Sequence, residues 1–296
     1  MTTTADMRPG GGARPVTRRR RPHWTRHLGA SGLALLFSLV WFFPVYWMIN
    51  TAFKPRSEVI SETPHFWPEH PTMHNFVIAV TETSFFTNLR NSVIVVGCAV
   101  VFAVVLAFFA SAALSRYRFR GRRAIMVAIL IVQMLPGTAL LIPQFLIFNR
   151  MGLINTYIGL ILAYVGAVLP FSIWVMRGFF LGVPKEVEEA AWIDGAGTWR
   201  TLWSVIFPLV LPGVISTSIF GFISAWNDYL TAYTFMKDSS MYTLPVWLVS
   251  FSTPVSGTDY GGQMAASVLF SLPVVIFFLI IQRNLVTGMS AGAVKG

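Results

Sequence analysis

Residues 28–49 of this chain read LGASGLALLFSLVWFFPVYWMI, a stretch without a charged side chain. As an α-helix it is about 33 Å long at about 1.5 Å per residue, enough to cross the hydrocarbon core of a bilayer. A secretory signal peptide has a shorter apolar region that ends at a small-residue cleavage site. Here the run ends in Trp41, Tyr46 and Trp47, whose rings favour the membrane–water interface. The stretch therefore predicts an uncleaved first transmembrane helix, assigned to residues 28–50.

Further uncharged runs follow along the chain, and each is long enough to predict another span. They lie at residues 91–114, 124–149, 155–176, 201–227 and 263–282. Several contain proline, which a membrane bundle tolerates because neighbouring groups satisfy the freed backbone. These prolines either kink the spans or shape their packing. The sequence therefore predicts an all-α integral membrane protein with six transmembrane helices.

Composition agrees with a membrane location. Hydrophobic residues make up 55% and charged residues 11% of the 296 positions, whereas a soluble globular chain carries about 25% charged residues. A net charge of +10 points to nucleic acid in a soluble protein, but here the basic residues lie at the ends of the apolar runs, where they act as orientation signals. The single cysteine, Cys98, allows neither an internal disulfide nor a metal site.

Lys and Arg are distributed unevenly between the segments outside the spans. With the N-terminus inside the cell, the cytoplasmic segments hold 17 of the 22 basic residues, including the run Arg18–Arg21 and five arginines within residues 116–123. The positive-inside rule then places both termini in the cytoplasm. We expect a disordered basic cytoplasmic tail over residues 1–27, an external loop over 51–87 and a cytoplasmic C-terminal tail over 285–296.

The cytoplasmic loop between the fourth and fifth spans has the sequence signals of a short helix. Residues 183–197 read VPKEVEEAAWIDGAG. Pro184 suits a first-turn position, the glutamates after it suit the positive end of the helix dipole, and Gly195 or Gly197 can end the helix. Its small apolar residues form a narrow face that another protein can approach closely. The alternative is an amphipathic connector that lies at the membrane surface.

Three short strings in and after this loop keep a fixed spacing. Glu189-Ala190-Ala191 is followed after three residues by Gly195, and after nine more by residues 205–208, which read VIFP. This order resembles the EAA motif of ABC importer permeases, in which Glu-Ala-Ala and Gly precede Ile-x-Leu-Pro. Val and Phe stand here in place of the Ile and Leu of that pattern, and both replacements are similar in size and polarity.

The resemblance implies a type-1 ABC importer permease fold, with the transmembrane domain over residues 88–284 and an EAA coupling loop over 183–208. In that family the loop docks on a separate ATPase, so the implied coupling residues are Glu188, Glu189, Ala190, Ala191, Asp194 and Gly195. Glu188 or Glu189 is expected to pair with a basic residue of the ATPase. The sequence has no Gly-x-x-x-x-Gly-Lys-Ser/Thr phosphate loop. We therefore expect a transporter subunit and not an enzyme, with ATP and Mg²⁺ bound by the partner ATPase.

Two further stretches narrow the resemblance. Residues 225–229 read AWNDY, and residues 282–296 complete the chain from Gln282 to Gly296. The first resembles the Trp-Asn-Glu/Asp stretch of carbohydrate permeases, and the second resembles the C-terminus of the maltose-permease G-type subunit. Together they imply sugar import across the bacterial cell membrane. The implied partners are an ABC ATPase dimer, an F-type permease, an extracytoplasmic sugar-binding protein and membrane lipid, with no nucleic acid. The G-type resemblance favours a heterodimer of permeases over a homodimer.

Four neighbouring residues are candidates for the substrate pathway: Trp226, Asn227, Asp228 and Tyr229. Polar groups in a span are costly to leave in lipid and default to a functional role, and sugars are bound through hydrogen bonds and aromatic stacking. The alternative is that Asp228 sits at the external interface, capped by water. The external loop 233–262 is, by the resemblance, a candidate contact for the binding protein, and otherwise a flexible connector.

Three other functions are compatible with a membrane location. An importer of glycerol phosphate or another polyol derivative would favour basic groups within the spans, and the sequence has none there. A secondary transporter usually carries more spans in inverted repeats, together with intramembrane carboxylates, and this chain offers at most Asp228. A membrane-embedded enzyme would need a cluster of His, Asp or Glu, or a Gly-x-Ser-x-Gly string, and the sequence has neither.

Overall fold

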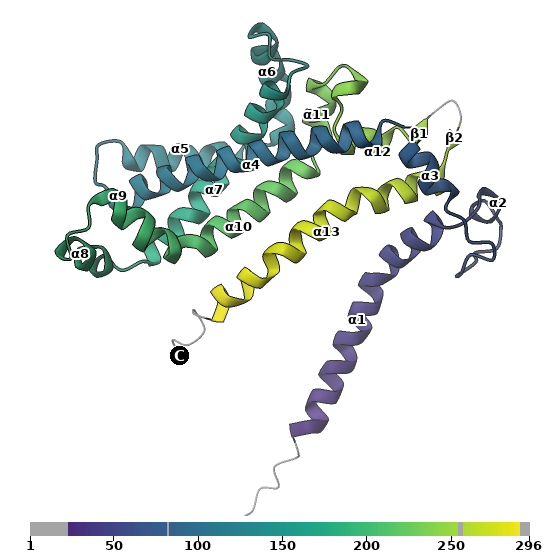
Figure 1. The fold of residues 1–296 in the computed structure, drawn as a ribbon, viewed down its shortest axis with the longest axis horizontal. Coiled ribbons are helices and arrows are strands. Elements are labelled where there is room, and N and C mark those ends of the chain that lie inside the picture. The colour runs from purple at the N-terminus through teal and green to yellow at the C-terminus, as the bar shows by residue number, and fades with distance from the viewer. Residues whose placement is uncertain (1–22, 82, 254–256, 291–296) are drawn as a thin grey trace, which may run out of the picture. The chain divides into compact units, whose positions relative to one another are not determined.

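The computed structural model describes residues 23–81, 83–253 and 257–290. They divide into two units, one ending at Trp47 and one beginning at Met48, and helix α1 (His23–Ala52) runs through the boundary. Helices make up most of the described chain (Figure 1). The predicted all-α class is therefore confirmed, with strands β1 (Ser252–Thr253) and β2 (Gly257–Thr258) adding a short antiparallel pair.

The first unit consists, in its described part, of α1 up to Trp47. The helix begins at His23, inside the stretch that the sequence assigned to the disordered tail, and residues 1–22 lie outside the described part. None of the side chains from Ser31 to Trp47 is buried. The ring of Phe43 lies 6.4 Å from that of Tyr46 and 6.0 Å from that of Trp47, so two of the three aromatic residues predicted at the interface share a cluster with Phe43.

The second unit contains the remaining elements. Its long helices are α4 (Phe85–Arg116), α7 (Tyr157–Gly182), α10 (Phe207–Trp226) and α13 (Tyr260–Ser290). Its shorter helices are α2 (Arg56–Val59), α3 (His74–Thr81), α5 (Arg122–Met134), α6 (Gly137–Arg150), α8 (Lys185–Ile193), α9 (Thr198–Thr201), α11 (Leu230–Phe235) and α12 (Leu244–Val249). A π-helical turn, η1 (Leu202–Ile206), joins α9 to α10, and a 3₁₀ turn, η2 (Ser239–Met241), precedes α12. Helix α13 continues to Ser290, into the predicted tail 285–296, and residues 291–296 lie outside the described part.

Five helices of the described chain are long and apolar enough to cross a membrane, and the total is six if α5 and α6 form one bent span. The run 124–149, predicted as one span, does not form one continuous helix, because α5 and α6 meet at 103° (Figure 1). The break falls at Leu135 and Pro136. Proline lacks an N–H and disfavours the helical conformation in the residue before it, and Leu135 is extended, with φ −76° and ψ 131°.

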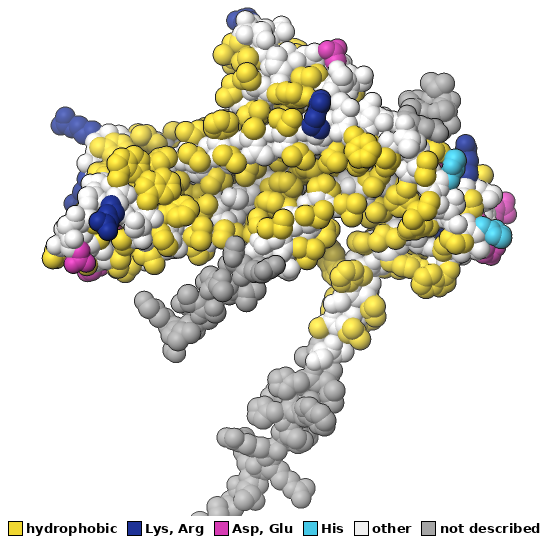
Figure 2. Space-filling model, in the orientation of Figure 1, with side chains coloured by type: hydrophobic (Ala, Val, Ile, Leu, Met, Phe, Trp, Pro, Cys, Tyr) yellow, Lys and Arg dark blue, Asp and Glu magenta, His cyan; other side chains and the backbone are white. Residues whose placement is uncertain are grey.

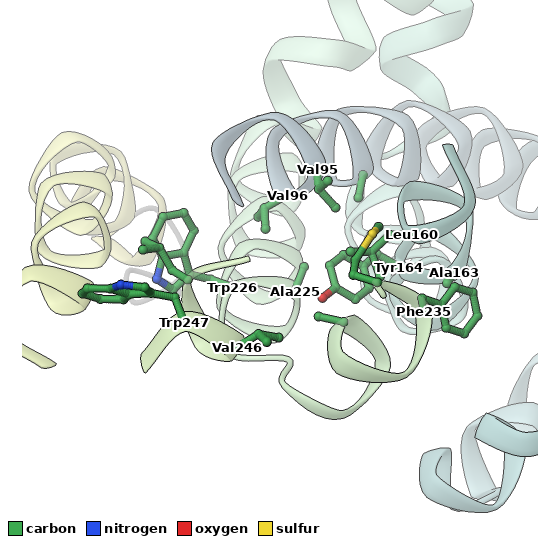
Figure 3. Close-up of a cluster of buried hydrophobic side chains, with 14 of the residues drawn as sticks. Val95, Val96, Leu160, Ala163, Tyr164, Ala225, Trp226, Phe235, Val246 and Trp247 are labelled. Atoms are coloured by element: carbon green, nitrogen blue, oxygen red, sulfur yellow. The ribbon is translucent and has the colours of Figure 1, made fainter. Parts of the chain in front are cut away.

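Helices α4, α7 and α10 pack against one another at the centre of the second unit, and α13 packs against α10, α3 and α12. One buried cluster joins side chains of α4, α7, α10, α11 and α12, among them Val95, Tyr164 and Trp247 (Figure 3). A second cluster, around Phe108 and Phe180, lies nearer the end that carries α8. These contacts fix the positions of the helix ends from which the loops emerge.

The surface of the second unit fits a lipid environment. Hydrophobic side chains cover most of the face in Figure 2, and the charged side chains lie at the ends of the long helices and around the part that carries α6 and α11. Helices α8 and α9 lie at one of these ends, and α3, α12 and the β1–β2 pair lie at the other (Figure 1). By the distribution of basic residues, the α8 end is the cytoplasmic one.

Candidate functional site

The predicted coupling helix is present as α8, Lys185–Ile193, directly after Pro184. Two backbone hydrogen bonds close its end: the N–H of Gly195 donates to Trp192 O at 3.0 Å, and that of Ala196 donates to Ala191 O at 2.9 Å. This is the Schellman arrangement, which requires a left-handed residue, and Gly195 has φ 80°. Of the two glycines predicted to end the helix, Gly195 is therefore the one that does.

The implied coupling residues do not all face the same way. Glu189, Ala190, Asp194 and Gly195 are exposed, and Ala191 is half-buried. Glu188 is buried, with 6% of its surface exposed. The exposed side chains form the outer surface of α8, and the large apolar side chain of Ile193, which is 86% exposed, extends this surface.

The carboxylate of Glu188 lies against a cation of the same chain. Its Oε1 is 2.5 Å from Nε of Arg116, the last residue of α4, and the two side chains are 8% and 12% exposed. Nη2 of Arg116 also donates to the carbonyl oxygen of Val183, at 3.1 Å. Val183 is the C-cap residue of α7, directly after its last residue, Gly182. The sequence predicted a basic partner for Glu188 or Glu189 on the ATPase, and the structure leaves Glu189 as the exposed carboxylate.

A cavity of about 700 Å³ opens beside this ion pair. The end of α4 forms one wall, α8 a second, and α9 with η1 a third. The charged side chains Arg116, Lys185, Glu188 and Glu189 line it together with the rings of Phe109, Tyr117, Trp192 and Trp199. The cavity therefore lies between α8 and the end of α4, and the Arg116–Glu188 pair bridges these two helices at its edge, while α8 also contacts α9 and η1.

The four candidate pathway residues are divided between the core and the surface. Trp226 is 2% exposed, and its indole N–H donates to Phe270 O at 3.4 Å (Figure 3). Its ring stacks on Phe222 with the centroids 5.2 Å apart. Asn227 is exposed and donates to Ile223 O at 2.8 Å within its own helix. Trp226 therefore packs inside the unit and offers no free face for a sugar.

Asp228 has a local structural role. Its Oδ1 accepts hydrogen bonds from the N–H groups of Thr231, at 2.9 Å, and Ala232, at 3.2 Å. Its Oδ2 accepts one from the hydroxyl of Thr231 at 3.1 Å. The carboxylate thereby caps the N-terminal turn of α11, where amides lack helical partners. The hydroxyl of Tyr164 also donates to Oδ1, at 3.3 Å, and Tyr229 stacks on Tyr233 with the centroids 5.4 Å apart.

A second cavity, of about 730 Å³, lies at the break between α5 and α6. Segments of α7, α10 and α11 complete its walls. Its polar side chains are those of Gln133, Thr138, Gln144, Tyr164, Ser224, Asp228 and Thr231. Of the four predicted pathway residues only Asp228 lines it. Sequence reasoning missed the other polar groups because most of them are isolated residues within apolar runs.

The external loop 233–262 is fixed at its base by two side chains of α4. Nδ2 of Asn91 donates to the carbonyl oxygens of Ser240 and Tyr242, both at 2.9 Å. The hydroxyl oxygen of Ser92 accepts the N–H of Leu244 at 2.7 Å. The part of the loop predicted to touch a binding protein includes residues 254–256, which lie outside the described residues. The segment up to Val249 is anchored to the bundle and is not a free connector.

Among the residues that the structure describes, no group of three or more His, Cys, Asp or Glu side chains could hold a metal ion. A model of the protein family described as "binding-protein-dependent transport system inner membrane component" matches residues 99–291.

Relatives match along almost the whole chain. The diacetylchitobiose uptake system permease protein DasC of Streptomyces coelicolor is 44% identical over 266 residues, covering 90% of this chain and 95% of that protein. The trehalose/maltose transport system permease protein MalG of Thermococcus litoralis is 34% identical over 270 residues, covering 89% of this chain and 95% of that protein. Because the similarity extends over about nine tenths of this chain, the sequence pattern around α8 lies within the region that is similar in these relatives.

The fold is similar to that of a solved bacterial ABC transporter for the import of the acidic polysaccharide alginate. The TM-score is 0.77 at 24% identity, and the match covers 89% of this chain and 98% of the chain in that structure. The likeness confirms the predicted importer permease fold.

Proposed function

Because this chain belongs to the family of binding-protein-dependent transport system inner membrane components, we propose that it is the permease subunit of an ATP-driven sugar importer. The chain is a membrane permease subunit and not an enzyme, it resides in the inner membrane, and it works with a substrate-binding protein. The sugar, the ATPase and the second permease are the parts of the proposal that need testing.

The exposed surface of α8 supports the proposed ATPase. Glu189, Ala190, Asp194 and Gly195 are exposed on a helix that the Schellman turn ends sharply. Small side chains let another backbone approach closely, and the exposed carboxylate of Glu189 offers a charge-assisted contact to a basic residue. The ATPase dimer would bind ATP and Mg²⁺, since this chain has no phosphate-binding loop.

The second cavity supports a pathway for a neutral, hydroxyl-rich cargo. Its polar groups are amides, hydroxyls and one carboxylate, and no Lys or Arg is among the described residues that line it. Such groups suit the hydroxyls of a sugar better than a phosphate, which basic side chains would favour. Similarity to permeases named for diacetylchitobiose and for trehalose/maltose uptake agrees with this class of cargo. A second, F-type permease would close the pathway from the other side.

The proposal is tested by purifying the complex from native membranes and measuring uptake. A C-terminal tag on this chain should recover an ATPase, a second permease and a binding protein, identified by mass spectrometry. The binding protein is then screened against di- and oligosaccharides and against glycerol phosphate. Recovery of this chain alone, under conditions that preserve a known membrane complex, would overturn the importer, and binding of glycerol phosphate alone would overturn the sugar.

Two substitutions test the two sites separately. Glu189→Arg should reduce the amount of ATPase that co-purifies, whereas Glu186→Arg, at another exposed carboxylate of α8, should not. Ser224→Trp places a large ring at the wall of the second cavity and should abolish uptake while the complex still assembles. Full uptake by the Ser224→Trp variant would place the pathway elsewhere.

A further inference from the structure

Helix α4 connects two features that lie at opposite ends of the second unit. Its last residue, Arg116, contacts the coupling helix, and Asn91 and Ser92 near its start hold the external loop. Figure 1 shows α4 running between the α8 end and the end with α12 and the β1–β2 pair. Its 32 residues span about 48 Å at about 1.5 Å per residue.

The contact at the cytoplasmic end joins three helices through one guanidinium. Arg116 belongs to α4, Glu188 to the first turns of α8, and the accepting carbonyl of Val183 to the end of α7. Arg116 and Glu188 are almost fully buried, so separating them would leave a charge without its partner in a poorly solvated place. A displacement of α8 is therefore resisted by Arg116 and passed to the ends of α4 and α7.

The contact at the external end is equally well defined. Asn91 is 0% and Ser92 1% exposed. Asn91 uses its amide N–H groups for the loop carbonyls of Ser240 and Tyr242, and its Oδ1 accepts the hydroxyl of Tyr157 at 2.7 Å. Buried polar groups are costly to leave unpaired, so the loop before α12 has to follow the start of α4.

The helix between these contacts is packed too tightly to absorb a shift. Ala99, Ala103 and Ala107 are buried along it, and the hydroxyl of Ser111 donates to Ile173 O of α7 at 3.0 Å. Small residues bring α4 close to α7, and the chain from Phe85 to Arg116 is one unbroken helix. A close-packed helix moves as a body, because side chains in such packing have few alternative positions.

We propose that α4 transmits displacements between the coupling helix and the external loop. The Arg116–Glu188 ion pair is its contact at the cytoplasmic end, and Asn91 and Ser92 form its contact at the external end. Glu188 is then a positioning residue that acts through Arg116 and does not contact the ATPase. This inference rests on the proposed function. It adds that binding-protein contact at the loop and ATPase contact at α8 influence each other through this one helix, and such coupling is reciprocal.

The test uses the complete importer, with its binding protein, in proteoliposomes. Two quantities are measured: the ATPase activity with and without the loaded binding protein, and the cargo transported per ATP hydrolysed. Glu188→Gln removes the charge with little change in shape, and Glu186→Gln on the same helix is the matched control. We expect Glu188→Gln to lower the stimulation by the binding protein about tenfold, with unchanged basal activity and an intact complex, and Glu186→Gln to behave as wild type.

A charge exchange tests whether the pair itself matters. Arg116→Glu and Glu188→Arg should each uncouple transport from hydrolysis, and the double variant should recover most of the stimulation because the opposite charges meet again. Loss of the ATPase from the Glu188→Gln complex would show that Glu188 contacts the ATPase and would overturn the inference. Wild-type stimulation in Glu188→Gln would overturn it as well.

The contact at the external end of α4 is tested with substitutions of two serines on this helix. Ser92→Ala removes the acceptor of the Leu244 N–H, and Ser111→Ala removes a buried hydroxyl that faces α7 instead. We expect about a threefold loss of stimulation in Ser92→Ala and none in Ser111→Ala. Combining Ser92→Ala with Glu188→Gln should lose no more than Glu188→Gln alone, since both interrupt one route.

These outcomes separate this inference from the proposed function. If the two losses multiply in the combined variant, the ends of α4 act independently and the inference is wrong, although the importer stands. If the wild-type chain neither binds an ATPase nor transports a sugar, the proposed function is what fails.

Discussion

The side chain of Asn155 holds the backbone around Asp238 in place. Its Nδ2 donates to Asp238 Oδ2 at 2.6 Å, and its Oδ1 accepts the N–H groups of Lys237 and Asp238 at 3.0 and 3.2 Å. Asn155 itself has φ 60°, a left-handed conformation that asparagine tolerates better than most residues. The turn before α7 and the loop after α11 are thereby joined outside the bundle.

Asn155→Asp should destabilise this junction by about 1 kcal/mol, because it replaces a donor by a carboxylate beside Asp238. The substituted oxygen can still accept the two backbone N–H groups, so the change isolates the amide. Adding Asp238→Asn restores a donor on the other side and should recover the lost stability. Thermal unfolding of the purified complex in detergent measures both, and a double variant no more stable than the single one would contradict the assignment.

Gly195→Ala should weaken the end of the coupling helix by about 1 kcal/mol, since Gly195 is left-handed at φ 80°. Gly197 has φ −71°, which any residue adopts, and is the N-cap residue of α9, so Gly197→Ser, which keeps a favourable N-cap residue, is the control and should be neutral. The ATPase that remains bound after washing the tagged complex in rising salt is the measurement. Equal retention in the two variants would show that the Schellman turn does not affect docking.

Asp228→Ala should cost about 1 kcal/mol through loss of the cap on α11. Asp228→Asn keeps an acceptor oxygen, so it should retain most of the stability and leave the cargo concentration for half-maximal uptake unchanged. Unfolding curves and uptake at varied cargo concentration give the two results. An increase in that concentration for Asp228→Asn would mean that the carboxylate binds cargo as well.

Pro136→Ala should let α5 and α6 approach a continuous helix, because it restores the missing N–H and frees Leu135 to become helical. The distance between spin labels at Val127 and Ile147, both on exposed positions, should then increase, and uptake should fall. Pro143→Ala, inside α6, is the control and should leave that distance unchanged. An unchanged distance in Pro136→Ala would mean that packing, and not the proline, sets the bend.

Much of the architecture follows from the sequence because the bilayer imposes one simple requirement, an uninterrupted apolar run for each span. The pattern over residues 183–197 predicts a helix with Pro184 at its start and Gly195 or Gly197 at its end, and α8 is observed from Lys185 to Ile193, since proline, glutamates and glycine mark its ends. The break at Pro136 could not be selected in advance, because other spans contain prolines within intact helices, as Pro170 and Pro273 do.

The pairing of Glu188 was also beyond the reach of the sequence. Five arginines lie within residues 116–123, and only the packing of α4 against α7 brings the first of them to α8. In the same way, the burial of Trp226 depends on the position of α13, whose Phe270 accepts its indole N–H, whereas the neighbouring Asn227 is exposed. Local patterns predict elements, whereas the choice of partner among similar residues is made by tertiary packing.

The bend between α5 and α6 also determines which solvent that part of the chain can face. A helix end leaves carbonyl or amide groups without partners in its own helix, and a break in mid-span therefore exposes two sets of them at membrane depth. Lipid tails offer no hydrogen bonds, so such groups persist only against protein or water. The side of the molecule that carries Leu135 and Pro136 is for this reason the hydrated or subunit-covered side, and acyl chains are confined to the remaining perimeter.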